Sequence, residues 1–240
     1  MNTIKINDHK NTLIVAHRGV SGIELENTLS AFVAAGNRSY YGIESDVHKT
    51  ADGKFVIIHD DHTGRVSDTR CEVEETDFDL LRSLELHDKS GYSSVDMRIP
   101  TLSEYITVCK RYGKVAVLEL KNSFTKEEVS AICAEIAELD YIGSTTFISF
   151  DFDNLVYVRE GYPEATVQFL MFRDFGSEVL MRLAEHRMDL DINYKEVTAE
   201  LIADCHAHGI RVNAWTVDDP AEADRLISYG IDYITTNILE

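Results

Sequence analysis

The chain has 240 residues, of which 44% are hydrophobic and 27% are charged, and its formal net charge is -19 at pH 7. This length suits one α/β barrel, so we expect residues 1–240 to form a single domain with a sizeable core. The negative charge, with no Lys/Arg cluster to offset it, disfavours nucleic acid and anionic membranes as partners. A phosphate-ester substrate would need a local positive centre, such as a metal ion or a positioned arginine.

The sequence shows neither a targeting segment nor a membrane span. Its N-terminus lacks a basic stretch followed by an apolar run, and no segment approaches the roughly 18 consecutive apolar residues that a span needs. We therefore expect a cytoplasmic protein without stable membrane association. The sequence does not indicate its oligomeric state.

Short β-branched segments alternate with helical patterns almost to the end of the chain. This alternation is typical of a parallel sheet whose strands are joined by crossover helices. The expected strands span residues 13–16, 42–47, 115–120, 146–149, 166–171, 188–192, 212–216 and 233–235. Eight strands predict a TIM barrel. The alternative is a doubly wound open sheet, but no GxGxxG motif follows the first strand to mark a dinucleotide site.

Apolar residues recur at three- and four-residue steps between these strands, which predicts amphipathic helices. The expected helices span residues 28–36, 101–112, 126–139, 151–161, 176–186, 198–208 and 220–229. Thr101 and Glu104 fit the Ser/Thr-x-x-Glu capping box at the start of the second helix. No full eighth helix is evident after the last strand, and the sequence does not predict what covers that strand.

Two segments depart from a plain strand–helix repeat. Residues 54–59 form an extra strand-like run after a turn at Asp52-Gly53, so we expect a hairpin with the second strand. Residues 60–100 are charged, irregular and longer than a usual connection, which predicts a small insertion at the top face of the barrel.

Ionisable residues are concentrated at the ends of the first three barrel strands, where the active site of a TIM barrel lies. Glu44 and Asp46 stand two apart on a strand, so their side chains point to the same face. Glu119 and Lys121 repeat this spacing on the next strand. Three carboxylates in one barrel mouth would repel one another unless a cation lay among them. Oxygen-only ligation then predicts one divalent cation, Mg²⁺ or Ca²⁺, with Mn²⁺ possible as well.

Each of these motifs has a plainer interpretation when it is taken alone. A pair such as Glu44 and Asp46 is usually surface-facing, and a lone histidine such as His59 is more often structural. Asn27 and Thr28 could simply cap the following helix. It is their joint placement at neighbouring strand ends that favours a functional site.

Four segments of the chain resemble the glycerophosphodiester phosphodiesterase family in order and approximate spacing. They read AHRGVSGIELENTLSAF, GIESDVHKTADGKFVIIHDD, LELK and VNAWTVDDPAEADRLISYGIDYITTN, and the resemblance spans residues 14–237. Leu25 and Ser45 depart from the family pattern without removing a functional group. The resemblance implies a TIM barrel with a small insertion after the second strand and hairpin. It also implies metal-dependent hydrolysis of a glycerophosphodiester to glycerol 3-phosphate and an alcohol.

The resemblance further implies catalytic and metal-binding roles for individual residues. His17 and His59 would be the general acid and the general base, and which of them has which role stays open. The divalent cation would be bound by the three carboxylates Glu44, Asp46 and Glu119.

Other residues would bind the substrate or support the site. Arg18 would hold the phosphate, and Lys121 would lie beside the phosphate or the metal. Trp215 and Phe150 would contact the glycerol carbons, unless they belong to the barrel core. The supporting residues of the Glu-Asn-Thr segment would be Glu26 and Asn27.

Two other functions stay open at this point. A related phospholipase-type barrel that cleaves intact lipids would need an apolar rim facing the membrane, and the acidic segment 60–100 offers no clear one. A barrel that binds a phosphodiester without turnover is disfavoured, because both histidines and all three carboxylates are present. The sequence does not predict the alcohol half of the substrate, since choline, ethanolamine, glycerol and inositol esters are all compatible.

Overall fold

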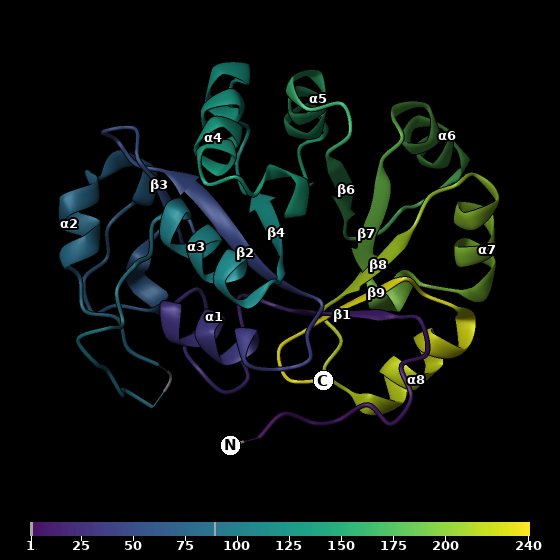
Figure 1. The fold of residues 1–240 in the computed structure, drawn as a ribbon, viewed down its shortest axis with the longest axis horizontal. Coiled ribbons are helices and arrows are strands. Elements are labelled where there is room, and N and C mark those ends of the chain that lie inside the picture. Colours follow the sequence, from purple (N-terminus) through teal and green to yellow (C-terminus); the bar gives the residue numbers. More distant parts are fainter. Residues whose placement is uncertain (1, 89) are drawn as a thin grey trace.

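A computed structural model describes residues 2–88 and 90–240 of the chain. In these residues the sheet runs in the order β1-β9-β8-β7-β6-β5-β4-β2-β3, and β1 also pairs with β2 (Figure 1). This last pairing closes a barrel of eight parallel strands, so the TIM barrel prediction is confirmed and the open-sheet alternative is wrong. The barrel strands are β1 (Leu13–Ala16), β2 (Gly42–Lys49), β4 (Val115–Leu120), β5 (Thr145–Ser149), β6 (Thr166–Met171), β7 (Asp189–Asn193), β8 (Val212–Trp215) and β9 (Tyr233–Thr236).

Helices cover the outer face of the strand ring (Figure 1). They are α1 (Leu29–Gly36), α3 (Leu102–Tyr112), α4 (Lys126–Glu138), α5 (Phe152–Gly161), α6 (Ser177–His186), α7 (Ala199–Ala207) and α8 (Pro220–Tyr229). Each begins and ends within one residue of its expected bounds. The predicted capping box is present, because the Thr101 side chain accepts a hydrogen bond from the Glu104 backbone and the Glu104 side chain accepts one from the Thr101 backbone. Local capping signals therefore account well for where these helices start.

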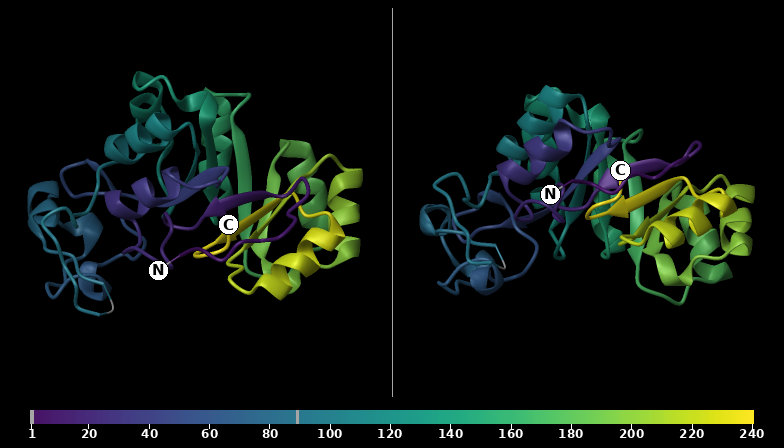
Figure 2. Two further views of the ribbon diagram at one scale, coloured as in Figure 1. Left: turned by 60° about the horizontal axis from the view of Figure 1, so that its bottom comes forward. Right: turned by 90° about the horizontal axis from the view of Figure 1, so that it is seen from below.

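The segment after β2 departs from the barrel repeat, as the sequence predicts. β3 (Phe55–Ile57) pairs antiparallel with β2 and completes the expected hairpin. Residues 60–100 extend from it to one side of the barrel (Figure 2). They contain a short helix, α2 (Phe78–Ser83), which the sequence analysis did not predict. The hairpin and this insertion share a small apolar core formed by Val56, Ile58, Val73, Leu81, Leu84, Leu86 and Ile99.

In the described residues, no helix follows β9. The backbone N of Ile4 donates to the carbonyl of Ile238 at 3.0 Å, and the backbone N of Glu240 donates to the carbonyl of Ile4 at 2.7 Å. Leu239 is fully buried in the main core. Most other barrel strands are followed by a helix, but the last strand is followed by an extended segment that pairs with the N-terminal segment around Ile4. Among the described helices, none combines the length and the apolar character that crossing a bilayer requires.

Candidate active site

The C-terminal ends of the barrel strands surround a cavity of about 350 Å³. One wall of this cavity is ionic and is formed by His17, Arg18, Glu44, His59, Glu119 and Lys121. A second part of the lining is apolar and is formed by Ile148, Phe150, Leu170, Phe172 and Trp215. The structure therefore brings together the strand-end residues that the sequence singled out, and it gives their cavity two unlike walls.

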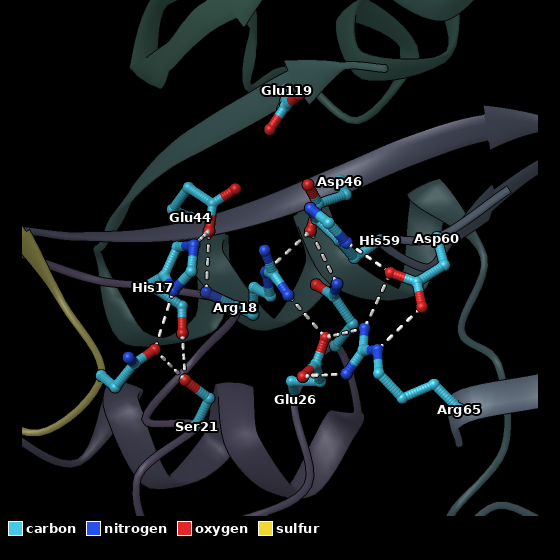
Figure 3. A network of polar contacts seen from close by, with 12 residues as sticks. His17, Arg18, Ser21, Glu26, Glu44, Asp46, His59, Asp60, Arg65 and Glu119 are labelled. Atoms are coloured by element: carbon cyan, nitrogen blue, oxygen red, sulfur yellow. Dashed lines mark hydrogen bonds and ion pairs between the residues drawn. The ribbon is translucent and has the colours of Figure 1, made fainter. Parts of the chain in front are cut away.

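Three carboxylates meet in the ionic wall. Glu44, Asp46 and Glu119 each offer one oxygen, and these oxygens all lie within 4.8 Å of one another. The strand register explains this, because Asp46 on β2 stands opposite Glu119 on β4 and Glu44 lies two residues before Asp46 on the same face. All three side chains are buried (Figure 3).

Two of the three carboxylates in this cluster, Glu44 and Glu119, have raised pKa values. Burial, together with the Asp46 charge, raises the pKa of Glu44 well above its usual range. The same two causes raise the pKa of Glu119 to about 8. Burial also acts on Asp46, but the charges of Arg18 and Lys121 outweigh it and lower the Asp46 pKa. In the described residues, Oδ1 of Asp46 is buried without a hydrogen-bond partner. A divalent cation fits this set, because it would neutralise the carboxylates and take up the free oxygen.

Arg18 lies between the acidic cluster and its supporting residues. Its backbone N donates to Oε2 of Glu44 at 2.7 Å, and its Nη1 donates to Oε1 of Glu26 at 2.8 Å. Its Nε lies 3.5 Å from Oδ2 of Asp46. The same Asp46 oxygen accepts a hydrogen bond from Nδ2 of Asn27 at 2.7 Å. Glu26 and Asn27 thus contact an arginine and a carboxylate of the cavity wall.

The turn after β1 brings His17 and Arg18 to the mouth of the barrel. Gly19 has a φ of 77°, in the left-handed region. A Cβ atom at this position would lie only 2.7 Å from the backbone carbonyl carbon of Ala31 on α1. Because both the dihedral and the space exclude a side chain, the His-Arg-Gly sequence needs its glycine.

His17 is held on one side and faces the acidic cluster on the other. Its Nδ1 lies 2.7 Å from Oδ1 of Asn237, whose Nδ2 donates to Oδ2 of Asp218 at 2.6 Å. This orients the amide oxygen towards the ring, so Nδ1 of His17 carries the hydrogen and Nε2 keeps its lone pair. Nε2 lies 3.9 Å from Oε2 of Glu44. Burial, and then the Arg18 charge, lower the pKa of His17 to about 4, so this ring is neutral near pH 7.

His59 lies near Asp46, whereas His17 lies near Glu44 (Figure 3). Nδ1 of His59 is 2.6 Å from Oδ1 of Asp60. Arg65 of the insertion donates from Nε to Oδ2 of Asp60 at 2.7 Å. It also donates from Nη1 to Oε2 of Glu26 at 2.6 Å. One arginine of the insertion therefore supports the carboxylates that hold His59 and Arg18.

Lys121 stands at the edge of the acidic cluster. Its Nζ lies 2.9 Å from Oε1 of Glu119 and 3.6 Å from Oδ1 of Asp46. The charges of both carboxylates raise the pKa of Lys121 although its burial opposes this. Because the chain has a net charge of -19, a phosphate-ester substrate would need a local positive charge to bind. Lys121 and Arg18 together provide such a charge.

The apolar wall is a cluster of three aromatic rings. The rings of Phe150 and Phe172 stack with centroids 4.8 Å apart. Trp215 meets Phe150 edge-on at 5.8 Å and Phe172 edge-on at 5.1 Å. Phe150 and Trp215 both line the cavity; Phe150 is partly exposed, whereas Trp215 also packs against buried residues of the barrel interior.

A family model supports the resemblance seen in the sequence. Residues 17–240 match the model described as the glycerophosphoryl diester phosphodiesterase family. The chain belongs to this family. Membership makes it an enzyme, a phosphoric diester hydrolase that acts on glycerophosphodiesters.

Relatives of known name and structure agree with this assignment. A glycerophosphodiester phosphodiesterase of Caldanaerobacter subterraneus subsp. tengcongensis is 29% identical over 229 residues, which cover 94% of each chain. The structure of an Oleispira antarctica phosphodiesterase in complex with the product sn-glycerol-3-phosphate is 29% identical, with a TM-score of 0.84, and the match covers 94% of this chain and 92% of that one. A Silicibacter pomeroyi structure has a TM-score of 0.86 at 23% identity, covers 99% of this chain and 91% of its own, and supports the fold.

The sequence analysis missed several residues of this family member's site. Asp60 directly follows His59 and could have been found by that adjacency. Asn237 closes the last of the four segments that carry the family resemblance, but nothing in the sequence connects it to His17. Arg65 lies in an irregular segment without a pattern. The missed residues are Asp60, Arg65, Phe172, Asp191, Asp218 and Asn237.

Proposed function

We propose that this chain cleaves glycerophosphodiesters to glycerol 3-phosphate and an alcohol, and that the reaction depends on one divalent cation bound by Glu44, Asp46 and Glu119. The convergence of these three buried carboxylates within 4.8 Å carries the proposal. The Oleispira antarctica relative, whose structure contains sn-glycerol-3-phosphate, supports a small-molecule substrate. Oxygen-only ligation favours Mg²⁺ or Ca²⁺, with Mn²⁺ as a third candidate. Such a cation would supply Lewis-acid stabilisation of charge on the phosphoryl oxygens.

Arg18 and Lys121 bind the phosphate group in this proposal. Both line the cavity and both flank the acidic cluster. Their charges act at close range, whereas exposed charges more than about 10 Å away are largely screened at 0.1 M salt. A chain with a net charge of -19 can therefore still attract a phosphodiester into this cavity.

The two histidines divide the proton transfers. Nε2 of His17 keeps its lone pair, so His17 accepts the proton of the attacking hydroxyl. If water attacks, glycerol 3-phosphate forms directly; if the substrate's glycerol hydroxyl attacks, a cyclic phosphate forms and a water molecule then opens it to glycerol 3-phosphate.

Burial lowers the pKa of His59, and the charge of Asp46 and the hydrogen bond to Asp60 oppose this only in part. The Asp60 carboxylate at Nδ1 nevertheless stabilises the ring whenever it carries a second proton. His59 therefore donates a proton to the oxygen of the leaving alcohol. Positioned acids and bases of this kind contribute about 10² to 10⁴ in rate.

The insertion takes part in this arrangement through Arg65. This side chain binds Asp60 and Glu26 at the same time, and these carboxylates hold His59 and Arg18. The barrel site thus depends on a residue of the segment 60–100. This dependence supports the proposal that residues 1–240 act as one domain.

The test is release of glycerol 3-phosphate from glycerophosphocholine and glycerophosphoethanolamine, after EDTA treatment and with Mg²⁺, Ca²⁺ or Mn²⁺ added back. Glu44→Gln removes one charged ligand, and Glu127→Gln, which removes an exposed carboxylate on α4, is the matched control. We expect a metal to restore activity in the unchanged chain and in the control, but not in Glu44→Gln. Full activity in EDTA would contradict the metal requirement. If neither ester were cleaved with any of the three metals, the proposal that glycerophosphodiesters are the substrate would be contradicted.

A further inference from the structure

His48 is a buried histidine to which the proposed reaction gives no role. It lies on β2, two residues beyond Asp46, and its side chain is 0% exposed. Both nitrogens of a buried imidazole need hydrogen-bond partners, because a polar group that leaves water without a partner costs free energy. The partners of the His48 ring therefore indicate what the ring does in the fold.

One nitrogen of His48 binds the backbone of His59. Nε2 of His48 lies 3.3 Å from the carbonyl oxygen of His59. A carbonyl oxygen only accepts, so Nε2 carries the hydrogen and donates it. A buried ring on β2 thus contacts the main chain of the residue that donates the proton in the proposed reaction.

His59 lies just beyond the ladder that joins β2 and β3. The pairing of the two strands ends at Ile57, and the backbone N of Ile58 adds one hydrogen bond to the carbonyl of Asp46 at 3.0 Å. The next residue is His59. The hydrogen bond from His48 continues the attachment of this segment to β2, so it fixes the backbone from which the His59 ring extends.

The other nitrogen of His48 meets a polar pair from two other segments. Nδ1 lies 3.4 Å from Nδ2 of Asn122, two residues after β4, and 3.4 Å from Oε1 of Glu74 in the insertion. Nδ2 of Asn122 also donates to this Glu74 oxygen at 2.7 Å. A carboxylate only accepts, so Glu74 turns the amide nitrogen of Asn122 towards the ring. Nδ1 of the neutral ring then accepts the second amide hydrogen, which agrees with a hydrogen on Nε2.

We propose that His48 is a positioning residue that holds the backbone carbonyl of His59, and that Glu74 of the insertion sets the direction of this hydrogen bond through Asn122. The inference rests on the proposed function, in which His59 donates a proton to the leaving alcohol. Without the donor at Nε2, the backbone of His59 is free to move, and its ring moves with it. A displacement of about 1 Å at a reacting group costs up to about 10² in rate.

The experiment compares two substitutions of the buried ring. His48→Leu removes both hydrogen bonds and keeps an apolar side chain in the space, whereas the amide of His48→Gln can still donate to the carbonyl of His59. Both are assayed by steady-state hydrolysis of glycerophosphoethanolamine with the metal that restores activity. We expect His48→Leu to lower kcat about 10- to 100-fold with KM within about twofold, because a reacting group is misplaced. His48→Gln should keep kcat within about threefold.

Carbon-13 NMR of the His59 carbonyl reads the contact without turnover. Carbonyl-labelled histidine and nitrogen-labelled aspartate together select His-Asp peptide bonds, of which the chain has two, His59-Asp60 and His87-Asp88. We expect the His59 signal to move in His48→Leu and to stay near its position in His48→Gln. The His87 signal is the internal reference.

Glu74→Ala tests the same contact without a change at the buried ring. Its loss leaves the Asn122 amide free to turn its oxygen to Nδ1, so that His48 no longer carries the hydrogen on Nε2. We expect kcat to fall about three- to tenfold and the His59 carbonyl signal to move, with little change in the melting temperature because Glu74 is partly exposed.

His62→Ala is the matched control for these variants. His62 lies in the same part of the chain, accepts a hydrogen bond from the backbone N of Gly64 at 3.3 Å and is not among the residues that line the cavity. We expect this variant to change neither kcat nor the His59 carbonyl signal.

Two outcomes would overturn the inference. A His48→Leu variant that melts earlier but keeps its kcat would show that the ring only stabilises the fold. If His48→Leu did not fold, a Glu74→Ala variant with an unchanged His59 carbonyl signal and an unchanged kcat would decide against the contact. An unchanged chain that cleaves no glycerophosphodiester would instead overturn the proposed function, and the carbonyl signal would still report whether His48 binds His59.

Discussion

The ionic wall of the cavity, carried by β1, β2 and β4, differs from the aromatic wall, carried by β5, β6 and β8, in how its side chains are held. On the ionic wall, His17 is held by Asn237 and His59 by Asp60. On the aromatic wall, the side chains are held by apolar packing: the rings contact one another, Trp215 also packs against the cluster that contains Ile148 and Leu170, and Phe172 is 61% exposed. Hydrogen bonds on the ionic wall thus fix the orientation of individual side chains, whereas the aromatic wall defines the shape of the cavity. We therefore expect changes in the first to act on turnover and changes in the second on substrate affinity.

The largest effect should come from removing a histidine of the ionic wall. We expect His17→Ala to lower kcat by about 10² to 10⁴, because the group that accepts the proton is lost. The measurement is steady-state hydrolysis of glycerophosphoethanolamine, with circular dichroism to show that the fold is kept. His208→Ala changes an exposed histidine after α7 and should have no effect. A loss of less than about threefold in His17→Ala would rule out the proton transfer.

A smaller loss should follow when the histidine stays and its support is removed. Asn237→Ala leaves Nδ1 of His17 without its acceptor, so the ring is free to change tautomer and orientation. We expect kcat to fall by about 10- to 100-fold with KM nearly unchanged, because the loss lies in the orientation of a reacting group.

Nitrogen-15 NMR of the His17 ring provides the direct readout of this support. It should show the hydrogen on Nδ1 in the unchanged chain and a mixture of tautomers in Asn237→Ala. Asn37→Ala, at the exposed end of α1, is the matched control. If Asn237→Ala changed neither the His17 tautomer nor kcat, Asn237 would not be the residue that orients His17.

The insertion's contribution to the ionic wall should be visible in how the stability of the fold depends on pH. Hydrogen bonds from Arg65 lower the pKa of Asp60, and they lower the pKa of Glu26 although its burial acts the other way. A lowered folded-state pKa adds stability above the usual value near ~4 and loses it as the pH falls through the lowered value. Arg65→Ala should therefore destabilise the fold at pH 7 by about 1 kcal/mol, since Arg65 is partly exposed and its ion pairs are screened.

Melting curves between pH 2 and pH 7 test this account of Arg65. The stability difference between Arg65→Ala and the unchanged chain should shrink as the pH falls from about 4 towards the lowered pKa values of Asp60 and Glu26. We also expect a loss of roughly tenfold in kcat at pH 7, since Asp60 and Glu26 would no longer be held in place. Arg70→Ala, which breaks a single exposed pair with Glu72, is the control. A pH-independent difference would show that the ion pairs are not the cause.

The sequence predicted the barrel and the acidic cluster because both follow from local rules. Alternation along a strand places Glu44 and Asp46 on one face, and parallel neighbours bring Glu119 beside them. Helix bounds were predicted within one residue because caps such as Thr101 act on adjacent residues. The short helix α2 was missed, since six residues with charged neighbours give no clear period.

The supporting contacts could not be predicted, because they depend on closure of the barrel. His17 and Asn237 are 220 residues apart in the sequence and meet only when β1 pairs with β9. Asp191 lacks a neighbouring motif, and its unsatisfied oxygen is visible only in the folded chain. Phe172 could not be separated from an ordinary surface residue, because its stacking on Phe150 depends on where two loops end.

The smallest effect should come from the aromatic wall. Phe172→Ala removes an exposed ring that contacts Phe150 and Trp215 and leaves every atom of the ionic wall in place. We expect KM for glycerophosphoethanolamine to rise about three- to tenfold, which is the cost of losing part of an apolar contact, with kcat within about twofold. Met181→Ala, an exposed apolar residue on α6, should change neither constant. A fall in kcat as large as that of Asn237→Ala would mean that the aromatic wall also orients the reacting groups, and the two walls would then not differ in the way their contacts suggest.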